Sequence, residues 1–143
     1  MKLLISEILQ KASNAKTKTE KIKILRDNNS QTLRSLFIWN FDETVISILP
    51  EGEVPFKPNP APIGTEHTRL ELEGRKLFHF VRGGSDIPSI RREAMFIQML
   101  EGLHPDEANI VCLVKDKKLQ DKYRITKAVV SEAFPQINWG NRS

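Results

Sequence analysis

The stretch LISEILQKASNAKTKTEKIKILRDNNSQTLRSLF, residues 4–37, decides the fold class. Its apolar residues recur at helical spacing, and the pattern is interrupted at two polar breaks, residues 13–16 and 28–30. Thr17 and Glu20 have the spacing of a capping box, in which each side chain satisfies a backbone N–H group at a helix start. The stretch therefore predicts three short helices, over 3–13, 17–27 and 31–40.

Helix signals return after residue 64. Thr65 can cap a helix, and the apolar spacing predicts one long helix over 66–82 that ends at Gly83-Gly84. The residues expected to face inward are Leu70, Gly74, Leu77, Phe78 and Val81. Ser85 or Asp86 is expected to begin another helix, with Pro88 in its first turn. The expected inward stripe of this helix is Ile90, Ala94, Ile97, Leu100 and Leu103.

The last third of the chain predicts two more helices. Pro105 suits a first helical position, and the acidic residues after it suit the positive end of the helix dipole. We expect this helix to contain the apolar run 110–114, with Cys112 as a buried thiol. A basic connector, residues 115–124, then leads to a final helix capped by Thr126 and ending near Ala133.

Residues 50–65 differ from the rest because they contain five prolines and two glycines. Proline removes a backbone donor and disfavours helix in the residue before it, so this segment is expected to be an extended loop. The chain as a whole predicts an all-α, single-domain helical bundle of about six to seven helices over 1–143. Residues 134–143 are expected to form a C-terminal tail anchored by Trp139.

Composition excludes several classes of protein. With 143 residues, 39% apolar and 28% charged, the chain is large and apolar enough for one ordered domain. A single cysteine cannot form an intramolecular disulfide, which fits a reducing compartment. The first apolar run is broken at once by Ser6 and Glu7, so we expect neither a signal peptide nor a membrane anchor. A cytoplasmic protein without a membrane partner is the expectation.

No catalytic constellation is evident. His67, His79 and His104 lack metal-ligand spacing, so we expect no metal, no cofactor and no catalytic residue. The Gly-x-Ser-x-Gly nucleophile elbow and the Lys-x-Asp-Gly adenylation motif do not occur. Arg82-Gly83-Gly84-Ser85 lacks the lysine and spacing of a Walker loop, and is expected to be a helix stop and restart that can touch a phosphate backbone.

One pattern imitates a metal-dependent nuclease. Pro105-Asp106 followed by Asp116-Lys117-Lys118 resembles the Pro-Asp…Asp-x-Lys arrangement in which two carboxylates hold magnesium and a lysine steadies the attacking water. This interpretation needs residues 110–114 to form a strand that ends at Asp116. The helix-start signal at Pro105 argues against it.

Charge is distributed unevenly along the chain. Residues 1–40 carry 8 basic and 3 acidic side chains and residues 112–143 carry 7 and 3, whereas the segments between them are net acidic. The basic residues cluster where helices are expected to begin, at 16–23 and 115–127, and helix starts favour phosphate. If the two clusters share one face they form a polyanion-binding surface; the alternative is an ordinary solvated lysine-rich surface.

Two segments resemble the N-terminal DNA-binding domain of ATP-dependent DNA ligases, especially the short phage kind. The first runs from Glu7 through Thr17-Lys18-Thr19-Glu20 to Phe37, and the second from Lys115-Asp116-Lys117-Lys118 to Phe134-Pro135. The resemblance implies an all-helical domain that grips duplex DNA through backbone contacts across the minor groove. Here Asp116-Lys117-Lys118 replaces the usual Arg-centred turn, and the catalytic domains are missing, so ligation is not implied. The chain also resembles uncharacterised small proteins of T-even-type marine phages.

We therefore expect a non-catalytic, sequence-tolerant double-stranded DNA-binding protein, accessory to phage DNA metabolism. Neutralising roughly 4–6 phosphates would give a slope of log K against log salt near −4 to −5. The alternative is a protein-interaction or virion structural module that docks through the proline-rich residues 55–62; a nuclease ranks third. The expected DNA-binding residues are Lys16, Lys18, Lys21, Arg82, Lys115, Lys117, Lys118, Lys122, Arg124, Thr126 and Lys127.

Overall fold

The first three helices are short, and the second and third each begin at a side chain that caps the helix. In the computed structural model, which describes residues 4–49 and 69–140, they are α1 (Ile5–Asn14), α2 (Lys18–Asp27) and α3 (Gln31–Phe41). The Thr17 hydroxyl accepts a hydrogen bond from the Glu20 N–H (3.2 Å). The Ser30 hydroxyl accepts one from the Leu33 N–H (3.1 Å). The three helices expected from residues 4–37 are confirmed.

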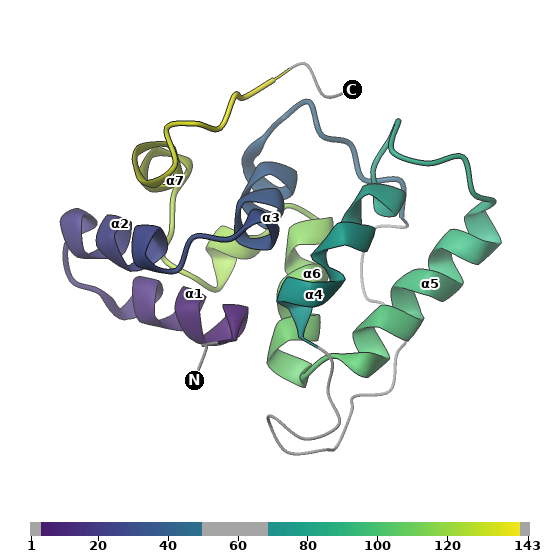
Figure 1. Ribbon diagram of the computed structural model, residues 1–143, viewed down its shortest axis with the longest axis horizontal. Helices are drawn as coiled ribbons and strands as arrows, with labels where there is room; N and C mark the ends of the chain where they lie inside the picture. The colour runs from purple at the N-terminus through teal and green to yellow at the C-terminus, as the bar shows by residue number, and fades with distance from the viewer. Residues whose placement is uncertain (1–3, 50–68, 141–143) are drawn as a thin grey trace.

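Helix α3 lies at the centre of the molecule (Figure 1). It packs against α4, α6 and α7, and its buried residues include Leu33, Leu36, Phe37 and Trp39. Aromatic rings extend this core, since the rings of Phe37 and Phe134 lie tilted against each other with centroids 6.3 Å apart. The fold is all-α, and α3 separates the group formed by α1, α2 and α7 from the group formed by α4 and α5.

The single long helix expected over 66–82 is wrong within the described residues. The chain forms α4 (Leu70–Glu73) and then a 3-10 helix, η1 (Gly74–Phe80). A Cβ atom added at Gly74 would lie 2.0 Å from the Thr32 hydroxyl oxygen, so this glycine lets the segment approach α3 closely. A 3-10 helix has three residues per turn, which turns Leu77 and Phe80 inward. Phe78, expected to be buried, is 49% exposed as a consequence.

The inward face of the next helix, α5 (Ser89–Gly102), also differs from expectation. The helix begins after Pro88 rather than at Ser85 or Asp86, and Ile90 and Ala94 are exposed. Leu100 and Leu103 are buried, as expected, and the buried face also contains Arg92, Phe96 and Met99.

Arg92 turns inward because its guanidinium forms hydrogen bonds with buried backbone carbonyl groups. Its guanidinium donates hydrogen bonds to the carbonyl oxygens of His79 (2.8 Å), Ser85 (3.3 Å) and Ile87 (2.9 Å). Buried carbonyl groups require such partners, so Arg92 fixes the path of the loop between η1 and α5.

The remaining helices are α6 (Pro105–Lys115), the 3-10 helix η2 (Leu119–Asp121) and α7 (Lys127–Ala133). The run 110–114 is helical, as expected. Cys112 in it is half-buried rather than buried, and burial raises the pKa of its thiol to about 11. Thr126 caps α7 by accepting from the Val129 N–H (3.3 Å), which confirms the expected last helix. None of the described helices has the length and apolar character needed to span a membrane.

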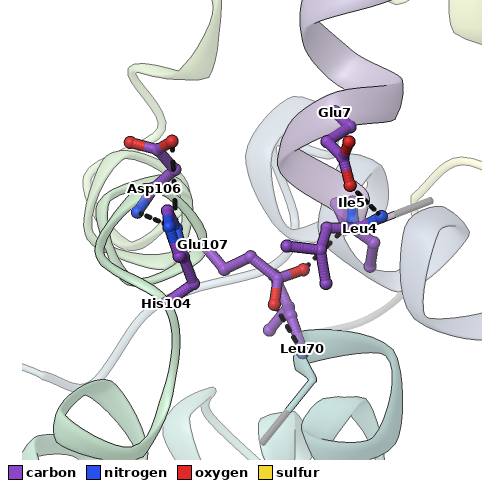
Figure 2. Close-up of polar contacts among 7 residues, drawn as sticks. All are labelled: Leu4, Ile5, Glu7, Leu70, His104, Asp106 and Glu107. Carbon is purple, nitrogen blue, oxygen red and sulfur yellow. Dashed lines mark hydrogen bonds and ion pairs between the residues drawn. The ribbon is translucent and has the colours of Figure 1, made fainter. Parts of the chain in front are cut away.

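A buried carboxylate connects three helices. Glu107, in the first turn of α6, is 1% exposed. One of its oxygens accepts from the Ile5 N–H at the start of α1 (3.1 Å), and the other accepts from the Leu70 N–H at the start of α4 (3.0 Å). Figure 2 shows the two oxygens directed to these two helix ends. Since the first N–H groups of a helix have no intrahelical acceptor, Glu107 satisfies an orphan donor in each.

Burial has a cost for this group. Desolvation raises the pKa of Glu107 above its ordinary value, and the hydrogen bonds from Leu70 and Ile5 and the charges of Arg69 and His104 offset the shift only in part. Because the folded pKa is raised, the contribution of this group to stability is complete below the unfolded pKa. It is lost as pH rises through the folded pKa.

We predict that Glu107→Gln lowers the free energy of unfolding by about 1–3 kcal/mol near neutral pH, because the amide N–H₂ must face one of the two backbone donors. Glutamine does not titrate, so the advantage of wild type over E107Q should shrink as pH is raised from about 4 upward. Urea unfolding of both proteins at several pH values measures this difference in the free energy of unfolding. Glu93→Gln, on the exposed face of α5, is the matched control and should change stability little. An advantage that grows with pH would contradict this account.

Candidate nucleic-acid interface

The two basic segments expected from the sequence are in direct contact. The Arg124 N–H donates to the Ser13 hydroxyl (3.0 Å), and the Lys21 ammonium donates to the Arg124 carbonyl oxygen (2.8 Å). Ser13 belongs to the end of α1 and Lys21 to the first turn of α2, whereas Arg124 stands two residues before the cap of α7. The connection between α1 and α2 therefore lies against the segment that leads into α7.

Lys21 holds this contact together. Its ammonium also donates to the carbonyl oxygens of Ala12 (3.0 Å) and Ser13 (3.2 Å) at the end of α1. An ammonium has three donors, and all three are used here on backbone oxygens. Lys21 was expected to contact phosphate; the structure assigns it a structural task, joining α1, α2 and the segment before α7.

Helices α2 and α7 are joined by two further cations. Lys18 forms an ion pair with Glu132 (2.8 Å) in which both side chains are about half exposed. Arg26 donates to the carbonyl oxygens of Glu132 (2.7 Å) and Ala133 (3.2 Å) at the end of α7. Figure 1 shows α2 and α7 beside each other at the same end of the molecule as α1.

A basic surface remains exposed around this contact, and we call it the junction surface. Beside it lies a groove of about 340 Å³ along α1, whose charged lining residues are two lysines, Lys11 and Lys122, and two carboxylates, Glu7 and Asp106. Lys11 is not among the DNA-binding residues expected from the sequence, although a lysine in the last turn of a helix beside a basic connector is a usable signal. The exposed cations of the junction surface are Lys11, Lys16, Lys18, Lys122, Arg124 and Lys127.

Two aromatic rings at this surface each form a cation–π contact with a lysine. The Lys122 ammonium lies 5.5 Å from the centroid of the Tyr123 ring, and the Lys127 ammonium lies 5.0 Å from that of Trp139. Tyr123 is buried, and Trp139 is half-buried. The cations are thus held over ring faces, by an attraction that still leaves their charge exposed.

Two of the expected phosphate-binding residues face inward. Lys115 is 3% exposed and pairs with Asp116 (2.6 Å). Lys117 donates to the carbonyl oxygens of Trp39 (2.8 Å) and Asp42 (2.7 Å), and burial lowers the pKa of its ammonium. Neither ammonium is placed to meet a phosphate in solvent. Lys117 is held by carbonyl groups at the end of α3, which require donors, and Lys115 is held by the Asp116 carboxylate.

The other expected residues are divided between two places. Lys118 is exposed, and the hydroxyl of Thr126 caps α7. Arg82 lies just after η1. Figure 1 shows the loop between η1 and α5 on the other side of α3 from α1 and α2. Ser85 does not lead directly into a helix, since α5 begins only at Ser89. The expected phosphate-touching loop thus stands apart from the junction surface.

The nuclease-like pattern is not assembled. Residues 110–114 belong to α6, which begins before Asp106 and ends just before Asp116. At 1.5 Å per residue the backbones of these two residues are roughly 15 Å apart, too far for one magnesium ion to bind both carboxylates. Among the residues that the structure describes, no three His, Cys, Asp or Glu side chains gather as metal ligands. The proline-rich residues 50–65 lie outside the described part of the chain.

Comparison with known proteins adds a family but no activity. Residues 8–121 match a family of unknown function, DUF6433. The chain belongs to this family. The matched region runs from the middle of α1 to the end of η2, so it includes Lys11 and Lys21 and stops before Lys122. No curated protein and no solved structure matched the chain.

We predict that Lys21→Met lowers the free energy of unfolding by about 1–3 kcal/mol, because three carbonyl oxygens lose a charged donor at once. Chemical denaturation in urea measures the change. Lys23→Met removes an equal charge from an exposed position of the same helix and should cost less than about 0.5 kcal/mol. Equal losses in the two variants would show that charge, rather than the carbonyl contacts, matters at Lys21.

Proposed function

We propose that this protein is a non-catalytic, sequence-tolerant double-stranded DNA-binding protein that holds the phosphate backbone at the junction surface. The observation that carries the proposal is the contact of Arg124 with Ser13 and Lys21, which joins two basic segments more than 100 residues apart in sequence. A continuous basic surface attracts a polyanion far better than two separated clusters, because the potentials of neighbouring charges add.

The geometry of helix α2 supports phosphate binding. Lys16 is exposed directly before Thr17, the cap of this ten-residue helix. The Thr17 hydroxyl satisfies only the Glu20 N–H, so the N–H groups of the first turn keep their partial positive charge at the surface. A phosphate oxygen placed there would meet backbone donors and a lysine together.

The chemistry of the surface favours backbone contact over base recognition. Five of its six exposed cations are lysines, which act as point charges rather than as bidentate readers of a base edge. Phosphate contacts position a protein on a duplex without selecting a sequence. The resemblance to ligase DNA-binding domains agrees with this mode. The inward turn of Lys115 and Lys117 makes the grip smaller than that resemblance implies.

We predict that the protein binds labelled duplex DNA with a slope of log K against log salt of about −3 to −4. This corresponds to about four neutralised phosphates. The slope is shallower than the −4 to −5 expected from the sequence because Lys21, Lys115 and Lys117 are used inside the protein. Fluorescence anisotropy at several salt concentrations measures it, with duplexes of different sequence giving similar affinities. A salt-independent affinity, or no binding at low salt, would refute the proposal.

A charge-matched pair of variants locates the surface. Lys16→Glu with Arg124→Glu should weaken duplex binding at least about tenfold, because it replaces two attractive charges by repulsive ones. Arg75→Glu with Arg82→Glu changes the net charge equally outside the junction surface and should leave affinity within about threefold. Both pairs alter exposed side chains, so thermal unfolding should confirm that the variants remain folded. Equal weakening in both pairs would mean that net charge alone binds DNA.

A further inference from the structure

A second surface feature lies between α3 and the segment formed by α4 and η1, outside the residues of the junction surface. Two hollows of about 450 and 440 Å³ meet there and share the residues Gln31, Ser35, Gly74 and Arg75. Their size is that of pockets that hold small ligands or a few side chains of a peptide. The close approach of Gly74 to Thr32 fixes the two walls relative to each other.

The lining of this groove is apolar and partly exposed. Trp39, Leu77 and Val81 line the larger hollow, together with Phe78, which is 49% exposed. The Phe78 ring rests against the ring of His79, with centroids 4.0 Å apart. Leu72, in the lining of the second hollow, is 64% exposed. Exposed apolar residues that cluster along one groove are typical of interaction sites.

The charged residues of the groove indicate what it would bind. Arg75 and Arg82 line the larger hollow, both are exposed, and neither forms an ion pair with another described residue. Glu71 lies in the lining of the second hollow only. The end of the groove near Phe78 therefore combines an apolar floor with two guanidinium groups, the combination found at the centres of protein interfaces.

We propose that this groove binds a short acidic and apolar peptide segment of a partner protein. A bulky apolar side chain of the partner packs against the exposed ring of Phe78, and carboxylates on either side of it pair with Arg75 and Arg82. A nucleic-acid backbone fits poorly, because it has no apolar group to fill the floor. A second copy of this chain related by a twofold axis would bring the same arginines together, which opposes self-association.

A random-sequence peptide library displayed on yeast and sorted against the folded protein tests the proposal. Enriched peptides should combine an aromatic or large aliphatic residue with flanking Asp or Glu. Synthetic copies should bind the wild-type protein in fluorescence anisotropy. Phe78→Ser, and separately Arg75→Glu with Arg82→Glu, should each weaken this binding at least about tenfold. A peptide whose acidic residues are replaced by lysine should bind the Arg75→Glu, Arg82→Glu variant more tightly than it binds the wild-type protein.

The junction surface supplies the matched control. Lys16→Glu with Arg124→Glu should leave peptide affinity unchanged, and duplex DNA should not displace the peptide, because no described residue lines both sites. The proposal is overturned if no peptide is enriched, if enriched peptides lack acidic residues, or if their binding survives Arg82→Glu and Phe78→Ser in folded protein. Failure of DNA binding would leave these outcomes unaffected, so the two proposals stand or fall separately.

Discussion

The two hydrogen bonds accepted by Glu107 are the constraint on which the arrangement of helices depends. They join the starts of α1 and α4, 65 residues apart in sequence, to the first turn of α6 at the centre of the molecule. A carboxylate with 1% exposure is tolerated only when its oxygens are used, so the position of each helix is coupled to the other two. Both proposed binding surfaces inherit their shape from this coupling, because α1 contributes to one and the segment after α4 to the other.

Charged side chains at the other helix ends extend the same principle. Short helices have many unsatisfied carbonyl groups relative to their length, and this chain meets them with cations. Lys21 binds the end of α1, Arg26 the end of α7 and Lys117 the end of α3, while Arg92 binds the loop after η1. Such contacts explain how a domain of modest apolar content holds its loops in place. They also withdraw several cations from any role in binding a polyanion.

The sequence predicts helix starts well where a side-chain hydroxyl caps the helix, and it predicts helix faces less well. Starts depend on local chemistry, as at Thr17 and Thr126, where a hydroxyl reaches a backbone donor three residues ahead. The faces of η1 and α5 depend on tertiary contacts, namely the approach of Gly74 to α3 and the inward turn of Arg92, which spacing alone does not reveal. The sequence predicts a polyanion-binding surface only if the two basic segments share one face. Only the fold could show which lysines stay outside.

Counting charges by region consequently misjudges both surfaces. Residues 1–40 have a net excess of five positive charges, yet Lys21 and Arg26 are used on carbonyl groups and Lys18 pairs with Glu132. The acidic middle of the chain would suggest repulsion of acidic partners, but Arg75 and Arg82 stand exposed beside an apolar floor there. What a partner meets is the set of charges left after the backbone has been satisfied. For this protein that remainder is a lysine-rich surface around α1, α2 and α7 and an arginine-flanked apolar groove between α3 and η1.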